Sequence, residues 1–368
     1  MNSLKLLSVG DILLQTRNDR HPFERVAPLL ADKDVLLGNL EVALTGSALA
    51  AEKSVPLVGH PEHVKYLREA GFDILSVANN HILDAGVEGF NDTLATLADN
   101  GIRIIGGANR KFPQSDCTLD SNGIRLGFLA YYIHGRTVES SGIVINRLEE
   151  RAAVADIRRL KQQCHHVVLS LHWGTEKSFY PSPSQIDLAH RLVDSGASII
   201  LGHHPHVIQG IEEYKGALIA YSLGNFQFLL NPADLPPHKD RRTNRSIILQ
   251  ISLSENTVDS YETIPVIIDD DFVPRECSSE EGEEMLSFIA GVSTLVVDGR
   301  VKSLPWYGYI AEIYLSENWR SFMIRIKRYG VWHLCKFIVW LITPFVLKCY
   351  AGWLWRKLSG QRSALEPS

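Results

Sequence analysis

The sequence predicts a layered α/β fold in which helices cover a largely parallel β-sheet. Up to about residue 221, short apolar runs alternate with amphipathic segments, which is the βαβ rhythm of such folds. Several amphipathic segments end at the Gly or Asn that commonly follows a helix. The chain has 368 residues, of which 45% are hydrophobic and 21% charged, so it has enough apolar side chains for a sizeable core.

The predicted strands are the short apolar runs, and the predicted helices are the segments between them. The runs predict strands at residues 4–9, 35–40, 73–77, 103–105, 126–132, 166–171 and 198–201. The segments between them predict helices at residues 61–71, 87–100, 148–163 and 184–196. Pro61 suits a helix start because its fixed φ is already helical, and Gly71, Asn100 and Gly196 suit helix ends.

The pattern changes after Tyr221, where β-rich segments replace the alternation. Further strands are expected at residues 247–253 and 258–268. A polar loop with three prolines, at residues 231–244, precedes them.

The last section of the chain differs from the rest in composition. Residues 304–360 are rich in Trp, Tyr and basic side chains, and an acidic stretch at residues 276–284 comes before them. We therefore predict two domains, residues 1–300 and residues 301–368. The first carries a net charge of −12 and the second +7, so an acidic body bears a basic tail. The acidic body gives no reason to expect a nucleic acid partner, whereas the tail suggests an anionic surface.

The basic tail has the composition of a membrane-interface segment. Residues 318–357 hold eight Lys or Arg and no Asp or Glu, interleaved with five tryptophans. The apolar run at residues 337–355 is interrupted by Pro344, Lys348 and Gly352, which favours a helix lying on the membrane over a spanning one. A docked or oligomerising helix and a true span are the alternatives.

The cysteines and the N-terminus indicate the compartment. The five cysteines are widely spaced and form no C-x-x-C pair, so a reducing compartment is the simpler interpretation. Only about six apolar residues precede Asp11, and no small-residue cleavage site follows them, so we expect no signal peptide. The predicted location is cytoplasmic, peripheral on the inner face of the cell membrane.

Metal-type ligands follow five of the predicted strands, at the point where each strand ends. Because parallel strands bring their carboxyl ends to one edge of a sheet, all five sets are expected to converge. They are Gly10-Asp11, Gly38-Asn39-Leu40-Glu41, Ala78-Asn79-Asn80-His81, His172-Trp173-Gly174-Thr175-Glu176 and Gly202-His203-His204-Pro205-His206.

The mixture of carboxylate, amide and imidazole groups predicts a divalent metal centre. These ligands suit Mn, Fe, Zn or Mg, and no soft thiolate lies near them in the sequence. Two ions about 3.5–4 Å apart would clamp a phosphoryl group and activate water. A single buried His or Asp is more often structural than a ligand, but that explanation would have to hold at five strand ends.

The individual motifs differ in how specific they are. His203, His204 and His206 form the strongest cluster, since imidazoles two residues apart in an extended segment point to one side, although which pair shares a metal stays open. The Asn79-Asn80-His81 run could instead form an Asx-type turn that caps the next helix. Gly10-Asp11 is equally compatible with a helix cap or turn, and Gly224-Asn225-Phe226 with a strand-ending turn.

These motifs, together with Tyr221-Ser222-Leu223-Gly224-Asn225-Phe226, resemble the capsule-synthesis CapA family, also called the poly-γ-glutamate synthesis type. The resemblance spans roughly residues 4–270, in the family's order. The family looks like a divergent branch of the calcineurin-like metallophosphoesterases. It therefore implies a four-layer α/β/β/α sandwich with a two-metal site, here followed by a basic, aromatic, helical appendage.

The resemblance also implies roles for the residues that match its motifs. Asp11 would bind the first metal, Glu41 would bridge both, and Asn80 would bind the second. His81 would be the acid that protonates the leaving oxygen. The two coordination spheres would be completed by His172 with either His204 and His206 or His203 and His206. Substrate-binding or supporting positions would be Asn39, Asn79, Asp84, Glu176 and Asn225.

Two departures from the ordinary phosphoesterase pattern affect the first metal. The usual Asp-x-His is Asp11-Ile12-Leu13 here, and the usual Gly-Asp is Gly38-Asn39, with the carboxylate displaced to Glu41. One imidazole ligand is therefore missing. The first site could be weak, could recruit His203, or could be absent.

The sequence and the resemblance together predict a metal-dependent phosphoesterase that serves capsule, exopolysaccharide or poly-γ-glutamate assembly at a membrane surface. Its substrate would be anionic, either a phosphorylated molecule or a polymer. One alternative is a non-catalytic assembly factor with a structural metal. The other is a metal-dependent amide hydrolase or transferase acting on poly-γ-glutamate, although the acidic body would repel a long polyanion.

Overall fold

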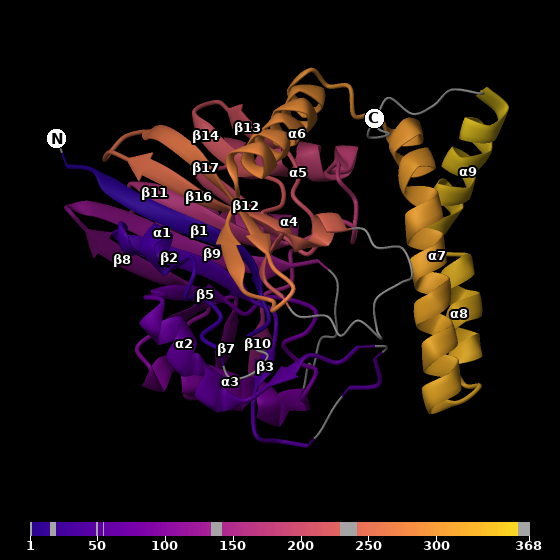
Figure 1. Ribbon diagram of the computed structural model, residues 1–368, viewed down its shortest axis with the longest axis horizontal. Helices are drawn as coiled ribbons and strands as arrows, with labels where there is room; N and C mark the ends of the chain where they lie inside the picture. The colour runs from indigo at the N-terminus through magenta and orange to yellow at the C-terminus, as the bar shows by residue number, and fades with distance from the viewer. Residues whose placement is uncertain are drawn as a thin grey trace.

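Two β-sheets pack face to face, and helices cover their outer faces, in the computed structural model (Figure 1). The structure describes residues 2–14, 20–48, 51–53, 55–133, 142–228 and 241–359. The layers are therefore helix, sheet, sheet and helix, which is the four-layer arrangement that the resemblance implies.

The first sheet has eight strands and is mixed. Its order is β18-β17-β16-β1-β2-β5-β6, with β15 also paired to β1. Strands β1, β2, β5 and β6 run parallel, and β16 to β18 continue the sheet antiparallel. The bounds are β1 Leu4–Ile12, β2 Val35–Leu40, β5 Ile74–Ser76, β6 Arg103–Ile105, β15 Asn225–Gln227, β16 Arg245–Leu253, β17 Val258–Ile268 and β18 Pro274–Glu276.

The second sheet has six strands in the order β13-β14-β12-β11-β9-β8. Strands β9, β11, β12 and β14 are parallel. The bounds are β8 Cys117–Ser121, β9 Ile124–Tyr132, β11 His166–His172, β12 Ile199–His203, β13 Ile211–Tyr214 and β14 Ala217–Ala220. Two short pairs lie outside the sheets, β3 (Ala43–Leu44) with β4 (Val58–Gly59) and β7 (Gly107–Asn109) with β10 (Ile143–Ile145).

Apolar side chains fill all three spaces between the layers. Leu6, Phe128 and Val168 belong to the cluster between the two sheets. A second cluster lies between the first sheet and α1 (Ala27–Ala31), α2 (Val64–Glu69) and α3 (Gly86–Asp99). A third lies between the second sheet and α4 (Glu150–Lys161) and α5 (Pro183–Asp194). Short 3-10 turns, η1 (Pro61–His63) and η2 (Arg241–Asn244), complete the body.

The strands and helices expected before residue 221 are all present, and so are the two later strands. The strands that sequence reasoning missed are mostly short or at a sheet edge, such as β8 and β13. The acidic stretch that precedes the predicted domain boundary begins a helix, α6 (Ser279–Val297), which packs against β13 and β17. Its acidic residues suit a helix start, because Ser278 and Glu281 form a capping box there.

Three helices form a column beside the body, α7 (Ser303–Tyr329), α8 (His333–Leu341) and α9 (Pro344–Ser359) (Figure 1). The start of α7 is part of the core, since Trp306 is fully buried and its Nε1 donates to the Tyr180 carbonyl at 3.0 Å. Within the described residues no single helix is long and apolar enough to cross a membrane, although α8 and α9 together, bent by 54°, have the length and composition.

Candidate metal centre

The polar strand ends meet where the carboxyl edges of the two sheets lie side by side. Asp11 stands near the end of β1, and Glu41 directly follows β2 in the same sheet. His172 ends β11 and His203 ends β12 in the other sheet, where the two residues are register partners. Asn80 follows β5 and reaches across to His172. The convergence expected at one sheet edge is therefore formed by two sheets.

A close backbone approach brings Asp11 to this edge. The Asp11 amide donates to the Gly224 carbonyl at 3.0 Å, as β15 runs beside β1. A Cβ atom at Gly10 would lie 2.0 Å from that carbonyl oxygen, so only glycine fits before Asp11. This contact accounts for both the Gly10-Asp11 motif and the Gly224-Asn225 motif.

Asp11 is fully buried and accepts three hydrogen bonds. Its Oδ1 accepts from Asn39 Nδ2 at 2.9 Å and from His203 Nδ1 at 3.1 Å, and its Oδ2 accepts from the His204 amide at 3.2 Å. Burial alone would raise the pKa of Asp11, but the hydrogen bond and charge of His203 hold it below its usual value. Asp11 is therefore kept as a carboxylate.

Glu41 is fully buried, and neither carboxylate oxygen has a hydrogen-bond donor among the described residues. Its Oε1 lies 3.6 Å from His172 Nε2, 3.7 Å from His206 Nε2 and 3.9 Å from His81 Nε2. Burial raises the pKa of Glu41 well above its usual value, and the charge of Asp11 adds to this. A buried carboxylate without donors is costly unless a cation satisfies it.

Two groups of ligand atoms share Glu41. One is Glu41 with His172 and His204, and the other is Glu41 with Asp11 and His206, each with its ligand atoms within 4.8 Å of one another. Mixed imidazole and carboxylate donors suit Mn, Fe or Zn. Each group could therefore hold a divalent ion, and Glu41 is common to both groups.

The loop after β12 holds its imidazoles by an unusual backbone. His204 has φ +92° and His206 has φ +58°, which is left-handed backbone that side chains with a Cβ rarely adopt. Such strain is concentrated at functional sites. It explains why the extended-segment argument could not decide which histidines act together.

His172 and His206 are oriented by amide side chains. Nε2 of His172 lies 2.6 Å from Asn80 Oδ1, and Nδ1 of His206 donates to Asn225 Oδ1 at 2.8 Å. Burial, then the charge of His204, holds the pKa of His172 well below its usual value. His172 is therefore neutral, which is the form that binds metals.

One imidazole ligand of the first metal site is missing from the sequence, and the positions of His203 and Leu13 show whether another residue replaces it. His203 is buried with Nδ1 on Asp11, and its Nε2 has no partner in the described part of the chain. His203 belongs to neither ligand group. Leu13, where the ordinary phosphoesterase pattern has His, is fully buried in the apolar cluster beneath the first sheet. His206, which approaches Asp11 Oδ2 at 3.4 Å, stands closest to that role.

His81 lies at the rim of the cluster with two charged partners. Its Nδ1 lies 2.6 Å from Asp84 Oδ2, and its Nε2 points toward Glu41. Lys53 contacts Asp84 Oδ1 at 2.6 Å and donates to the Asn80 carbonyl at 2.5 Å. Burial lowers the pKa of His81, against the opposing effect of Asp84. Lys53 was missed from the sequence, because no strand or motif leads to its loop.

The supporting positions expected from the resemblance all adjoin the cluster. Asn79 is buried and donates to the Leu40 carbonyl at 2.7 Å, which fixes the backbone before Glu41. Asn39 links Asp11 to His172 Nδ1, at 2.9 and 3.3 Å. Glu176 lies in the loop after β11 with an exposed side chain, and its negative charge adds to the pKa rise of Glu41.

Comparison with known proteins places this arrangement in a family. The model of the family described as bacterial capsule synthesis protein PGA_cap matches residues 5–229, which include all these strand ends. The chain belongs to the PGA_cap family. This membership confirms the resemblance drawn from the motifs.

Two curated relatives match most of this PGA_cap chain. The capsule biosynthesis protein CapA of Bacillus anthracis is 33% identical over 287 residues, 72% of this chain and 67% of the relative. The PGA biosynthesis protein CapA of Bacillus subtilis (strain 168) is 32% identical over 283 residues, 71% of this chain and 70% of the relative. Among solved structures, the calcineurin-like phosphoesterase YfkN of Bacillus subtilis aligns with 82% of this chain and 99% of its own, at 14% identity and a TM-score of 0.44.

Proposed function

We propose that this PGA_cap chain is a metal-dependent phosphoester hydrolase that serves capsule or poly-γ-glutamate assembly. The assembly role is suggested by the names of its two Bacillus relatives. The chemistry is suggested by the site. The observation that carries the proposal is the buried carboxylate of Glu41, which has no donor in the described residues and lies between two groups of metal-type ligands.

The ligands divide into two sets. Asp11, Glu41 and His206 would hold one ion, and Glu41, His172, His204 and Asn80 the other. When bound, divalent ions neutralise charge on a phosphoryl group and lower the pKa of coordinated water. Asn39, Asn79 and Asn225 hold these ligands in place through the hydrogen bonds described above.

His81 would supply the proton that the leaving group needs. As the P–O ester bond breaks, the proton on His81 Nε2 would pass to the alcohol oxygen that departs. Asp84, bound to Nδ1 at 2.6 Å, fixes the ring so that Nε2 faces the cluster. Lys53 in turn holds Asp84, so two residues position one proton donor.

The first experiment combines metal content with turnover. Protein purified without chelator would be analysed for bound metals and assayed on a phosphomonoester and a phosphodiester with added manganese. We expect about two divalent ions per chain, as in other two-metal sites, and metal-dependent hydrolysis. Bound metal without turnover on any phosphoester would contradict the proposal and favour a non-catalytic assembly factor.

The role of His81 is tested by how strongly the leaving group needs a proton. In His81→Asn we expect metal content to be retained and hydrolysis of phenyl phosphate to fall by about 10²- to 10⁴-fold. Hydrolysis of p-nitrophenyl phosphate should fall less, because nitrophenolate departs without a proton. His60→Asn is the matched control, since His60 lies on the surface. Equal losses on both esters would exclude His81 as the proton donor.

A further inference from the structure

The helical column is held together by its inner side. An aromatic seam joins α7 to α8, with Phe322 5.1 Å from Phe337 and 5.5 Å from Trp340 between ring centroids. Backbone contact joins α7 to α9, where Gly352 leaves no room for a Cβ against Gly308. These contacts involve the side of α8 and α9 that faces α7. The opposite side of the two helices takes no part in them.

The side of α8 and α9 that is turned away from α7 is apolar and exposed. On α8, Leu334, Ile338 and the following Ile342 recur every four residues and are 47%, 55% and 67% exposed. They therefore lie on one face of the helix. The outer face of α8 and α9 consists of Trp332, Leu334, Ile338, Val339, Ile342, Leu347, Tyr350, Trp353, Leu354 and Leu358. Both helices lie on the far side of α7 from the body in Figure 1.

Basic side chains accompany the outer face. Lys336 is exposed on α8, Lys348 is exposed on α9 with its Nζ 5.6 Å from the centre of the Tyr307 ring of α7, and Lys357 reaches over the Trp353 ring at 5.8 Å. Residues 318–357 contain no acidic residue. Apolar residues mixed with tryptophan and lysine match the boundary between lipid headgroups and acyl chains.

We propose that the outer face of α8 and α9 docks on the surface of an anionic lipid bilayer. Charge favours the bilayer over a second copy of the chain, because two such faces would bring their lysines together. The outer face lies along two helices bent by 54°, and neither alone is long enough to span. Insertion to the depth of the headgroups uses the apolar side chains without burying the helix backbone in hydrocarbon.

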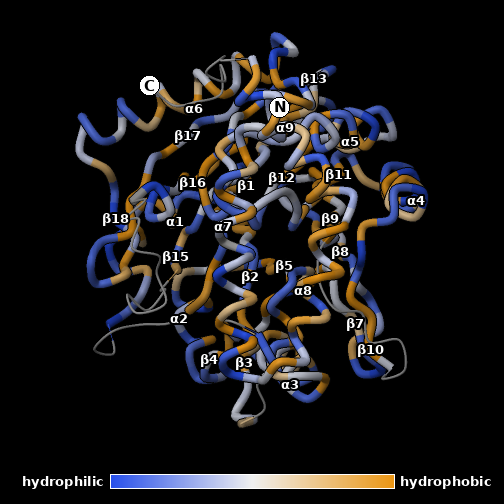
Figure 2. The backbone as a smooth tube through the Cα atoms, turned by 90° about the vertical axis from the view of Figure 1, so that its right-hand side faces the viewer, coloured by the Kyte–Doolittle hydropathy of each residue, from blue (hydrophilic) through white to orange (hydrophobic). Residues whose placement is uncertain are grey.

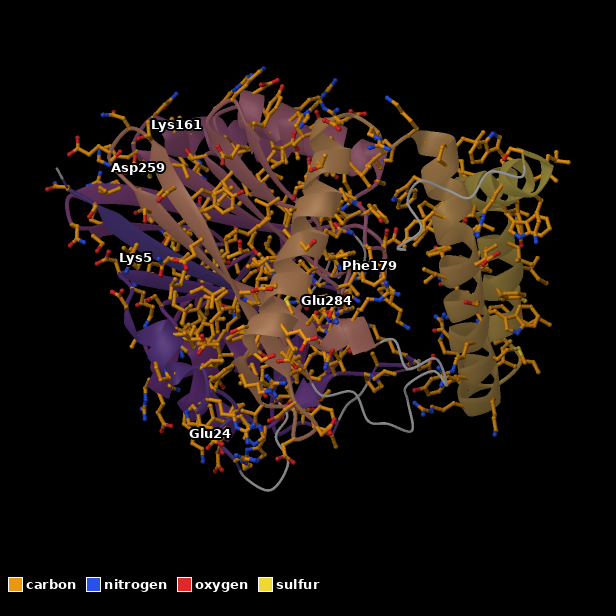
Figure 3. The ribbon with its side chains drawn as sticks, turned by 45° about the horizontal axis from the view of Figure 1, so that its top comes forward. Lys5, Glu24, Lys161, Phe179, Asp259 and Glu284 are labelled. Carbon is orange, nitrogen blue, oxygen red and sulfur yellow. The ribbon has the colours of Figure 1, made fainter. Side chains whose placement is uncertain are left out.

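Helix α7 of the column also contacts two loops beside the metal centre. Near its start, Tyr309 Oη accepts from the Phe179 amide at 3.1 Å, in the loop that carries Glu176. At its end, Tyr329 Oη donates to the Lys53 carbonyl at 3.1 Å, in the loop that reaches His81. Figure 3 shows Phe179 on the side of the body that faces α7, and Figure 2 shows the column in front of the body.

Helix α7 therefore connects two loops on either side of the site. Docking of the column would hold the site close to the bilayer surface. If the proposed function holds, the substrate would then be a phosphate ester carried at that surface. This consequence rests on the proposed function, whereas bilayer docking does not.

Vesicle cosedimentation of the full-length protein tests the docking directly. We expect binding to vesicles of phosphatidylcholine mixed with phosphatidylglycerol, weaker binding to phosphatidylcholine alone, and loss of the difference at high salt. Equal binding to both vesicle types, or no binding, would overturn the proposal. Turnover of soluble p-nitrophenyl phosphate on the same samples reports the proposed function separately.

Substitutions on α8 and α9 test whether their outer face is the surface that contacts the vesicles. The pair Ile338→Ser and Leu347→Ser should lower the partition coefficient by about tenfold or more, because two apolar side chains no longer enter the bilayer. The pair Lys336→Glu and Lys348→Glu should lower it at least about tenfold on anionic vesicles only. Both pairs should keep turnover of the soluble ester. The controls are Val144→Ser, 54% exposed on β10, and Lys65→Glu, exposed on α2.

Three results would overturn the assignment to this face. Serine variants that bind as tightly as the parent would move the docking site elsewhere. Controls that lose binding equally would show a general effect of surface charge or polarity. Sedimentation equilibrium without lipid checks the rival occupant, since a dimer that the serine pair disperses would make the outer face an interface between copies.

Discussion

At the residue scale, Glu41 shows what the site needs. A carboxylate that is fully buried without a hydrogen-bond donor in the described residues weakens the folded state unless it is protonated or meets a cation. Asp11, which has three donors, does not have this problem. Glu41 is therefore the position at which metal binding would be most directly coupled to folding.

This coupling predicts how metal changes the melting temperature. Manganese at about a hundred times its Kd should stabilise the chelator-treated protein by about 2.7 kcal/mol, a rise in Tm of about 3–4 °C for a chain of this length. In Glu41→Gln the rise should largely vanish, because both ions lose a shared ligand. Differential scanning calorimetry measures the shift, with the exposed Glu62→Gln as control. An undiminished rise in Glu41→Gln would place the metal elsewhere.

Single residues also mark how far the sequence could predict this site. The convergence of Asp11, Glu41 and His172 could be expected, because each lies at the end of an apolar strand and parallel strands end at one edge of a sheet. The choice among the histidines after β12 stayed open, because it depends on the left-handed backbone of His204 and His206. Lys53 could not be found, since it approaches Asp84 from a loop that no periodicity places.

At the element scale, the strands could be predicted from the sequence more completely than the helical column. The buried parallel strands were predictable because each is a nearly continuous apolar run. The tail was predictable as helical and amphipathic but not in its packing. Two of its five tryptophans, Trp340 and Trp355, are partly buried rather than exposed, and Trp340 stacks on Phe337 at 5.6 Å. Composition alone does not tell an aromatic that faces a neighbouring helix from one that faces outward.

The contact between α7 and α9 depends on one glycine. A Cβ at Gly352 would lie 2.4 Å from the Gly308 nitrogen and 2.6 Å from the Tyr307 carbonyl carbon, both backbone atoms that cannot turn aside. Gly352→Val should therefore separate the helices at a cost of about 1–3 kcal/mol. Hydrogen exchange should show faster exchange in α9.

The neighbouring residue provides the control for this prediction. Ala351 is exposed, so Ala351→Val adds the same side chain to the same helix without touching α7. Its effect should stay within about 0.5 kcal/mol. If both variants left α9 equally protected, the close contact at Gly352 would not hold the column together.

At the scale of the whole molecule, the start of α7 links the column to the body. Trp306 is fully buried in the same apolar cluster as Leu192 of α5 and Leu169 of β11. Its indole is hydrogen-bonded to the Tyr180 carbonyl. The sequence placed a domain boundary near residue 300, on composition alone. Residues 301–368 could unfold together with the body or in a separate transition. Because Trp306 connects the two parts, a substitution there distinguishes these cases.

Substitutions of two tryptophans of α7 test whether the column and the body unfold together. Trp306→Ala should lower the free energy of unfolding of the whole protein by about 3–5 kcal/mol, because it empties a site shared by column and body. Trp319→Ala, 55% exposed further along α7, should cost about 1 kcal/mol or less. Urea unfolding followed by far-ultraviolet circular dichroism gives both values. If Trp306→Ala left the main transition unchanged and moved only a minor one, the column would be an independent folding unit that is tethered to the body.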